Sequence, residues 1–187
     1  MRLLTFLFLN SVFITAMLIP SPGFSDQSDS RLDNLFSLLK QTENPATLRN
    51  TENQIWEIWL QHPNADVERL MLLATQRMNS QHYTEALAVF SQIIKSFPDY
   101  AEGWNKRATL HYVVGNLDAS VSDIEKTLEL EPRHFGALSG LGMVYIQREE
   151  LSKAKQSFEE LIKLHPNSPN AQQNLEFVNE RLRLTII

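Results

Sequence analysis

The chain has 187 residues, of which 43% are hydrophobic, so it is long enough for one packed domain and a processing segment. Its net charge of −5, with acidic and basic residues interspersed, leaves no basic stripe for phosphate groups and argues against a nucleic-acid partner. It has no cysteine, so an exported form would be stabilised by a helical core and not by disulfides. Six glycines, eight prolines and apolar residues spaced three and four apart predict an all-helical protein.

Residues 1–25 have the organisation of a signal peptide. One arginine precedes an apolar stretch over residues 3–19, and the small residues Gly23 and Ser25 stand just before a cleavage point at Asp26. We therefore expect export, with a bacterial periplasm as the destination that fits best, and no contact with a membrane after cleavage. An uncleaved membrane anchor is the alternative, although the apolar stretch is shorter than the about 20 residues that a membrane span requires.

Residues 28–63 are predicted to form a pair of helices. Ser30 followed by Asp33 matches a capping box at the start of the first helix, and Asn44 followed by Pro45 predicts the start of the second. Each helix has an apolar stripe, formed by Leu32, Leu35, Phe36 and Leu39 in the first and by Leu48, Ile55, Trp56, Trp59 and Leu60 in the second. We expect this pair to act as a degenerate repeat or N-terminal cap that stacks on the first of the repeats that follow.

Two tryptophans of the second helix, Trp56 and Trp59, lie three residues apart on its apolar stripe. Tryptophan is enriched at binding hot spots, which would favour exposure and contact with a partner. Aromatic residues also dominate protein cores, and we favour that interpretation, with both rings packed against Leu70 and Leu73 of the following unit.

Three prolines close similar segments at a constant interval. Pro98, Pro132 and Pro166 are separated by 132 − 98 = 34 and 166 − 132 = 34 residues. A period of this length is typical of stacked helix pairs, in which each proline ends the second helix of a pair. The three units defined in this way are residues 67–100, 101–134 and 135–168.

Matching positions of the three units carry matching chemistry. Position 8 is small and position 24 is large, so the two helices of each unit can approach closely and fill the space between them. The small residues are Ala74, Ala108 and Gly142, and the large ones are Phe90, Ile124 and Phe158.

This pattern resembles the tetratricopeptide repeat (TPR) family, whose signature is W-x2-L-G-x2-Y followed by A-x3-F and P. The second unit departs from the signature, since Arg107, His111 and Ile124 stand where the family prefers Leu, Tyr and Phe. The third unit matches best, at Leu138, Leu141, Gly142, Tyr145, Ala154, Phe158 and Pro166. Over residues 67–168 the resemblance implies three full repeats in a right-handed superhelix of stacked antiparallel helix pairs. A plain helical bundle would require the proline spacing to be accidental.

Residues 169–187 are expected to form a C-terminal capping helix and a short tail. Leu175, Val178 and Leu182 lie on one face of a helix that is otherwise polar and extends to about Arg183. Repeat arrays need a cap with a polar outer face for solubility. The last residues, LTII, are apolar and either pack on this cap or dock a partner.

The sequence contains no motif typical of an enzyme or a metal-binding protein. No pair of histidines has a metal-binding spacing such as H-E-x-x-H, and there is no G-x-S-x-G motif and no phosphate-binding loop. The histidines are His62, His82, His111, His134 and His165. We therefore expect no catalytic residue, no metal and no cofactor, and an enzyme of an unrecognised type is the less favoured alternative.

In TPR proteins the first helix of each pair lines a concave groove, so the resemblance implies a partner-binding surface at the corresponding positions. The positions we select for this groove are Met71, Thr75, Met78, Asn105, Thr109, Tyr112, Ser139, Met143 and Ile146. Methionines suit an adaptable apolar surface. Of the Lys, Asn and Arg residues with which some TPR grooves hold a C-terminal carboxylate, only Asn105 and Lys106 occur here. The groove is therefore expected to bind a helix or an apolar peptide.

The sequence thus predicts a non-catalytic scaffold or adaptor of the cell envelope that binds another protein or peptide. A membrane-tethered scaffold that keeps its N-terminal segment is the alternative. A further alternative concerns the groove floor, which residues 28–41 or the LTII end of the same chain could cover, because large exposed apolar patches are rare on monomers.

Overall fold

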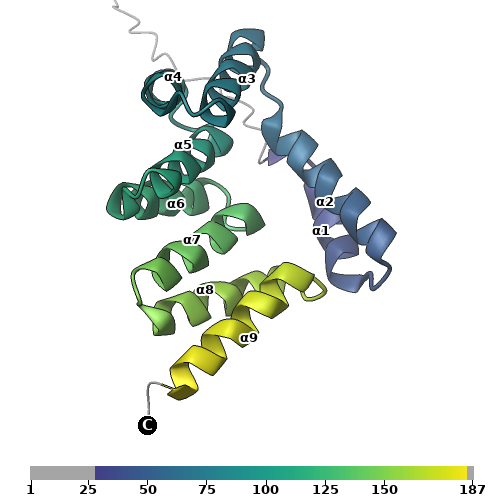
Figure 1. Ribbon diagram of the computed structural model, residues 1–187. Coiled ribbons are helices and arrows are strands. Elements are labelled where there is room, and N and C mark those ends of the chain that lie inside the picture. Colours follow the sequence, from purple (N-terminus) through teal and green to yellow (C-terminus); the bar gives the residue numbers. More distant parts are fainter. Residues whose placement is uncertain (1–27, 185–187) are drawn as a thin grey trace, which may run out of the picture.

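The computed structural model describes residues 28–184, in which the chain forms nine α-helices and no strand (Figure 1). The prediction of an all-helical fold is confirmed for these residues. The signal-peptide prediction for residues 1–25 and the LTII end at residues 185–187 lie outside the described residues. The helices are α1 (Arg31–Gln41), α2 (Pro45–Leu60), α3 (Ala65–Asn79), α4 (Tyr83–Ser96), α5 (Ala101–Val113), α6 (Leu117–Leu130), α7 (Phe135–Gln147), α8 (Leu151–Leu164) and α9 (Pro169–Leu184).

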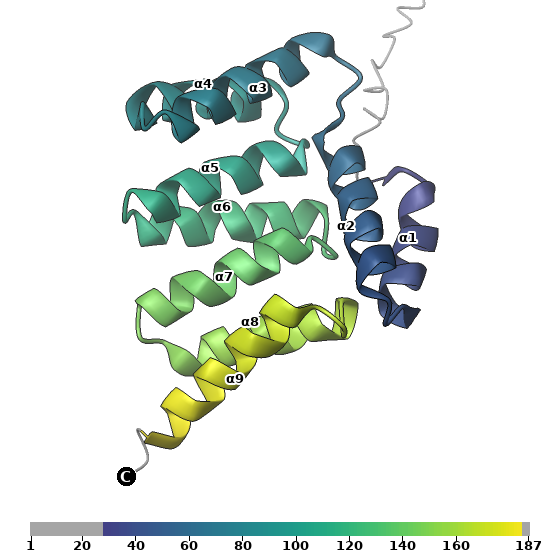
Figure 2. The same ribbon diagram turned by 45° about the vertical axis from the view of Figure 1, so that its right-hand side comes forward.

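Helices α3 to α8 form three antiparallel pairs that stack in chain order, and α9 continues the stack at its C-terminal end (Figures 1 and 2). The two helices of the third pair meet closely because position 8 has no side chain there. A Cβ atom on Gly142 would lie 2.4 Å from the ring of Phe158, which is fully buried. The predicted complementarity of small and large residues is therefore confirmed in this pair.

Each pair turns through the same backbone conformation at position 15 of its unit. The residue there has a positive φ, of 62° at Gln81, 80° at Gly115 and 59° at Glu149. This left-handed conformation lets the next amide group close the end of the first helix. The equivalent hydrogen bonds run from His82 N to Arg77 O, from Asn116 N to His111 O and from Glu150 N to Tyr145 O, at 2.9, 2.8 and 2.9 Å.

Helices α1 and α2, which we call the N-terminal hairpin, lie alongside the stack and cross the ends of its helices (Figure 2). The hairpin contacts three successive junctions, where the second helix of one pair leads into the first helix that follows. In order, the contacts are Leu60 O with Tyr100 Oη (3.1 Å), the Trp59 ring with the His134 ring (4.1 Å between centroids) and Thr42 O with Asn167 Nδ2 (2.8 Å). The N-terminal hairpin, from the loop before α2 to the end of α2, therefore spans all three junctions.

The expectation that this pair stacks on the first repeat, with Trp56 and Trp59 on Leu70 and Leu73, is wrong. Both tryptophan rings instead contact Phe135 at the start of α7, with ring centroids 5.3 and 5.0 Å apart. Leu73 remains 37% exposed on α3. The apolar stripe of α2 reaches an aromatic cluster at the second junction, which offers more area to bury than the aliphatic face of α3.

The capping box predicted at the start of α1 does not form. Ser30 makes no side-chain capping bond, and the Asp33 carboxylate accepts a hydrogen bond from Arg133, at 2.7 Å, which ties α1 to the junction before α7. The predicted start of α2 is confirmed, since the Asn44 side chain accepts hydrogen bonds from the amides of Ala46 and Thr47.

Candidate functional site

A hollow of about 130 Å³ opens between α5 and α7, the first helices of the second and third pairs. It contains five of the nine residues predicted for the groove, namely Asn105, Thr109, Tyr112, Ser139 and Met143. Its remaining lining residues are Ala108, Ser120, Ile124, Gly136 and Gly140. All ten belong to α5, α6 or α7, so residues 28–41 do not cover this part of the floor.

The other four predicted groove residues lie outside the hollow. Met71 is only 4% exposed and belongs to the core of the first pair, against which Met78 also packs. Ile146 packs against the core that joins the third pair to the N-terminal hairpin, and Thr75 is half-buried. Met71 therefore contributes to stability and does not present a surface to a partner.

The hollow exists because several of the residues between α5 and α7 have small side chains or none. A Cβ atom on Gly140 would lie 3.6 Å from the Cδ1 of Ile124, which is ordinary contact, so the glycine leaves free space above this isoleucine. Ala108 and Gly136 have little or no side chain, and Tyr112 and Met143 supply apolar walls. A cavity of this size in an apolar surface accommodates one aliphatic or aromatic side chain.

A buried carboxylate beside the hollow occupies the polar groups that could otherwise hold a peptide terminus. The Glu102 side chain is fully buried and accepts a hydrogen bond from Asn105 Nδ2 at 2.8 Å, while Lys106 Nζ lies 3.1 Å from its other oxygen. Burial raises the pKa of Glu102, but the hydrogen bond from His134 and the charge of Lys106 outweigh it and hold the pKa below its usual value. Glu102 therefore already accepts the hydrogen bond of Asn105 and compensates the charge of Lys106 from within the chain.

His134 fixes this carboxylate from the junction before α7. Its Nδ1 accepts a hydrogen bond from the amide of Ala137 at 3.0 Å, so the proton of the neutral ring is on Nε2. Nε2 lies 3.1 Å from Glu102 Oε2 and donates to it. The ring also stacks on Trp59 with an interplanar angle of 10°, which joins the N-terminal hairpin to the wall of the groove.

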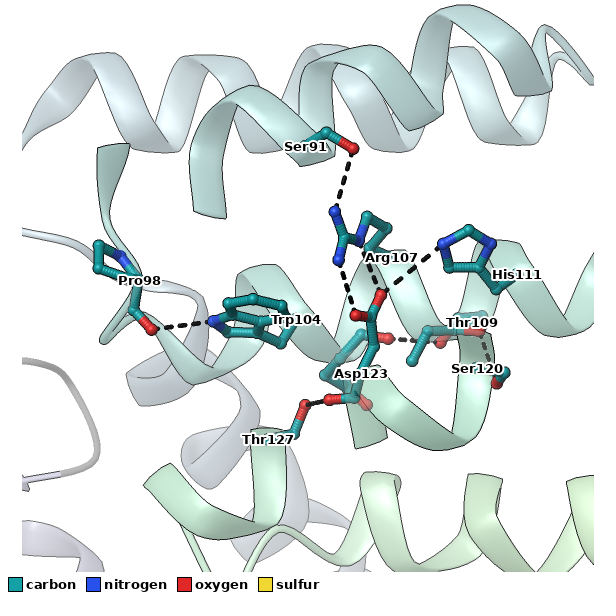
Figure 3. A network of polar contacts seen from close by, with 11 residues as sticks. Ser91, Pro98, Trp104, Arg107, Thr109, His111, Ser120, Asp123 and Thr127 are labelled. Carbon is teal, nitrogen blue, oxygen red and sulfur yellow. Dashed lines mark hydrogen bonds and ion pairs between the residues drawn. The ribbon is translucent and has the colours of Figure 1, made fainter. Parts of the chain in front are cut away.

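Two of the departures from the family signature in the second unit, Arg107 and His111, belong to a polar network inside the stack (Figure 3). Arg107 donates to both oxygens of Asp123 at 2.7 Å and to Ser91 Oγ at 3.2 Å, so it joins α4, α5 and α6. His111 Nε2 lies 3.8 Å from the same carboxylate, and burial lowers the pKa of this histidine. The Trp104 ring covers Arg107 and donates from Nε1 to Pro98 O at 2.9 Å.

We did not predict this network from the sequence. Its signal was an arginine at position 7, where the other two units have leucine, combined with an acidic residue at position 23, where they have Val89 and Ser157. A charge that replaces an apolar core residue needs a partner of opposite charge, since an unpaired buried charge is costly.

The described residues contain no cluster of His, Cys, Asp or Glu side chains that could hold a metal ion. None of the described helices is both long enough and apolar enough to span a bilayer. The hollow between α5 and α7 is thus small and mostly apolar, and Asn105 and Lys106 beside it already contact Glu102.

The family model for the tetratricopeptide repeat matches residues 71–121 and 105–169. The chain belongs to the tetratricopeptide repeat family. A TPR repeat-containing protein of Rhizobium etli is 34% identical over 166 residues, which cover 89% of this chain and 81% of the relative. DnaJ homolog subfamily C member 3 of Homo sapiens is 26% identical over 65% of this chain, which spans only 25% of that protein.

Solved TPR domains share the fold. The first TPR of Spaghetti (RPAP3), bound to an HSP90 peptide, superimposes with a TM-score of 0.60 at 20% identity, over 63% of this chain and 93% of that domain. The type III secretion chaperone SycD of Yersinia enterocolitica, in complex with a peptide of the translocator YopD, gives a TM-score of 0.60 at 16% identity, over 63% of this chain and 95% of SycD. The prediction of a TPR superhelix is therefore confirmed.

Proposed function

We propose that this chain is a non-catalytic scaffold that binds an apolar peptide or helix of another protein on the concave side of its stack. The observation that carries the proposal is the hollow between α5 and α7, which is open, mostly apolar and sized for one side chain. The TPR domains of RPAP3 and SycD, which have the same fold, hold peptides in their solved structures. This supports peptide binding as the use of the groove here.

The polar surroundings of the hollow favour an apolar ligand over a peptide C-terminus. A carboxylate-binding groove needs cations that are free to pair with the ligand. Here Asn105 and Lys106 already contact the buried Glu102. An incoming carboxylate would have to displace that internal partner, whereas an apolar side chain would enter the hollow without disturbing it.

Filling the hollow with a larger side chain tests whether the partner binds there. Gly140→Leu places a side chain in the hollow, while Ala88→Leu, at an exposed position of α4, adds a leucine elsewhere on the stack as a matched control. A protein captured from an envelope extract by the unmodified chain should be retained by Ala88→Leu and lost with Gly140→Leu. Both variants must unfold at the temperature of the parent or above it. Equal capture by all three proteins would show that binding occurs elsewhere.

We further propose that the chain is exported and acts as an adaptor in the cell envelope, most naturally in a bacterial periplasm. The support is the signal-peptide organisation of residues 1–25. Determining the N-terminal residue of the protein from cell fractions tests this directly. A first residue near Asp26 in the soluble periplasmic fraction supports export, whereas an intact Met1 in the membrane fraction supports a tethered scaffold.

A further inference from the structure

A second, more polar pocket of about 310 Å³ lies next to the hollow, where the N-terminal hairpin meets the third pair and α9. Helix α2 contributes Glu52 and Trp56, α7 contributes Gly136 and Ser139, and His165 closes it from the end of α8. We call it the hairpin pocket, because the repeats alone do not complete its wall.

The hollow and the hairpin pocket share a wall, so one ligand can occupy both. Gly136 and Ser139 line each of them. The indole of Trp56 borders this wall so closely that a Cβ atom on Gly136 would lie 2.5 Å from it. A chain segment in the concave groove would therefore pass from the hollow to the hairpin pocket along the edge of this tryptophan.

Glu52 is the only acidic or basic residue other than His165 among the residues that line the hairpin pocket. Within residues 28–184, its one ion-pair contact is to His165 Nδ1 at 3.5 Å. Burial lowers the pKa of His165 to about 4, so this ring is neutral at neutral pH and does not balance the carboxylate. Partial burial also raises the pKa of Glu52, whose side chain is 28% exposed.

The nearest cations do not supply the missing partner. Lys106 Nζ lies 5.5 Å from the centre of the Trp56 ring, but it is paired with Glu102 at 3.1 Å. Arg49, an exposed residue one turn before Glu52, lowers the pKa of Glu52 less than burial raises it. The second ring nitrogen of His165, Nε2, is buried and has no hydrogen-bond partner. The pocket thus holds one carboxylate, with no lysine or arginine in its lining, beside further hydrogen-bonding groups.

We propose that the ligand of the groove is a peptide segment with a basic side chain close to an apolar one, the lysine or arginine pairing with Glu52 and the apolar side chain filling the hollow between α5 and α7. This inference rests on the proposed function and adds the chemistry of the partner. The acidic half of the site is built by the N-terminal hairpin and not by the repeats.

The lining of the hairpin pocket favours an organic cation over a metal ion. Ca²⁺ requires six to eight oxygen ligands, commonly with several carboxylates, and this pocket has a single carboxylate. An ammonium or guanidinium group instead needs one carboxylate and a few neutral acceptors. The side chains of Asn53, Ser139, Ser168 and Asn170 line the pocket and provide such acceptors.

Selection of peptides from a random phage-displayed library on the purified protein tests the inference. We expect the selected sequences to combine one or more apolar residues with an enriched lysine or arginine. The dissociation constant of a selected synthetic peptide should rise roughly tenfold or more with Glu52→Gln, as for loss of a charge-assisted hydrogen bond. Glu57→Gln, at an exposed position of the same helix, is the matched control and should leave the constant unchanged.

The outcomes separate this inference from the proposed function. If binding depends on Gly140 but the peptides lack enriched basic residues, or if Glu52→Gln binds as the parent does, the pairing with Glu52 is overturned and groove binding stands. If no peptide is selected, or if Gly140→Leu leaves binding intact, both are overturned. Replacing the basic residue of the peptide with glutamate should abolish binding to the parent, and retention of that peptide would also contradict the pairing.

Discussion

The second and third repeats have the same turns and the same helix lengths, but their interiors differ in chemistry. The third repeat is filled by apolar contacts, with the ring of Phe158 against the bare backbone of Gly142. The second repeat contains the Arg107–Asp123 pair, whose side chains are 20% and 4% exposed. A TPR backbone therefore tolerates a charge at a core position when its partner is supplied from the facing helix.

The histidines near the ends of these two repeats differ in how their ring nitrogens are hydrogen-bonded. His134 uses both ring nitrogens in hydrogen bonds, to Glu102 and to the amide of Ala137. His165 has a contact to Glu52 through Nδ1 only, and its Nε2 is buried without a partner. Both repeats thus retain buried polar atoms without a hydrogen-bond partner, namely Glu102 Oε1 and His111 Nδ1 in the second and His165 Nε2 in the third.

Asp123→Ala should destabilise the protein most, by about 3–5 kcal/mol, because it leaves the Arg107 charge buried without its partner. Urea denaturation measures this change. The double variant Arg107→Leu with Asp123→Val, which copies Leu73 and Val89 of the first repeat, should recover most of the loss. A double variant as unstable as Asp123→Ala alone would show that the second repeat needs the charges themselves.

Acidification should destabilise the fold through His165. Its pKa of about 4 in the folded state lies below the ordinary value of 6.5, so the unfolded chain takes up the proton first as the pH falls. The contribution of the neutral His165 ring to the free energy of unfolding is fully present above pH 6.5. It is lost as the pH falls toward 4 and amounts to about 3 kcal/mol, at 1.36 kcal/mol per pKa unit.

His165→Phe is the reference variant for this effect, since it keeps a ring beside Phe135 without a titrating group. Glu52, whose pKa is raised, acts in the opposite direction in both proteins, so the difference between their pH profiles isolates the histidine. Chemical denaturation at a series of pH values should give parallel profiles above pH 6.5 that diverge below it. Profiles that stay parallel down to pH 4 would refute the assignment.

Gly142→Ala should destabilise the third repeat by about 1–3 kcal/mol, because the added methyl group would lie within 2.7 Å of three ring atoms of Phe158. Gly140→Ala, two residues earlier on the same helix, should stabilise the third repeat by about 0.5–1 kcal/mol. Its methyl group would lie 3.6 Å from Ile124 Cδ1, an ordinary contact, and alanine favours helix over glycine. Thermal unfolding of the two variants compares them directly. Equal shifts of the same sign would mean that backbone propensity, not packing, decides both.

Glu149→Gly should give the smallest effect, a gain of about 0.5–1 kcal/mol. Glu149 has a φ of 59° in the turn of the third repeat, where the second repeat has Gly115. A side chain in this conformation is strained, and glycine relieves the strain. The reciprocal change Gly115→Ala should cost about 1 kcal/mol in the same denaturation assay. A loss of stability with Glu149→Gly would point to an ionic role of this side chain.

The repeating part of the fold was predictable because its information is local and periodic. The spacing of Pro98, Pro132 and Pro166 and the alternation of small and large residues define each pair and its neighbour. The placement of the N-terminal hairpin was not predictable, because the stripe of Trp56 and Trp59 shows which face of α2 is apolar but not which surface receives it. The aromatic cluster that receives it is formed only when residues 134 and 135 are brought beside it by the stack.

The groove was predictable only in part for a related reason. The repeat position identifies residues on the first helix of each pair, and the structure places Tyr112 and Met143, two of the residues so identified, in the lining of the hollow. The repeat position alone does not show that Met71 is buried, because the burial of this side chain depends on how closely α4 packs against α3. It also gave no indication of Glu52, which lies outside the repeats and approaches the groove only through the fold.

The course of the N-terminal hairpin across three junctions has a consequence for how the protein folds. Arrays of repeats behave as one-dimensional systems, in which each unit interacts with its neighbours and the ends fray independently. Here hydrogen bonds join residues 40, 100 and 125 positions apart, at Tyr100 with Leu60, Arg133 with Asp33 and Asn167 with Thr42. Such contacts raise the contact order and couple units that do not touch, so the chain should fold more slowly than a bare array of three repeats and unfold in one cooperative transition.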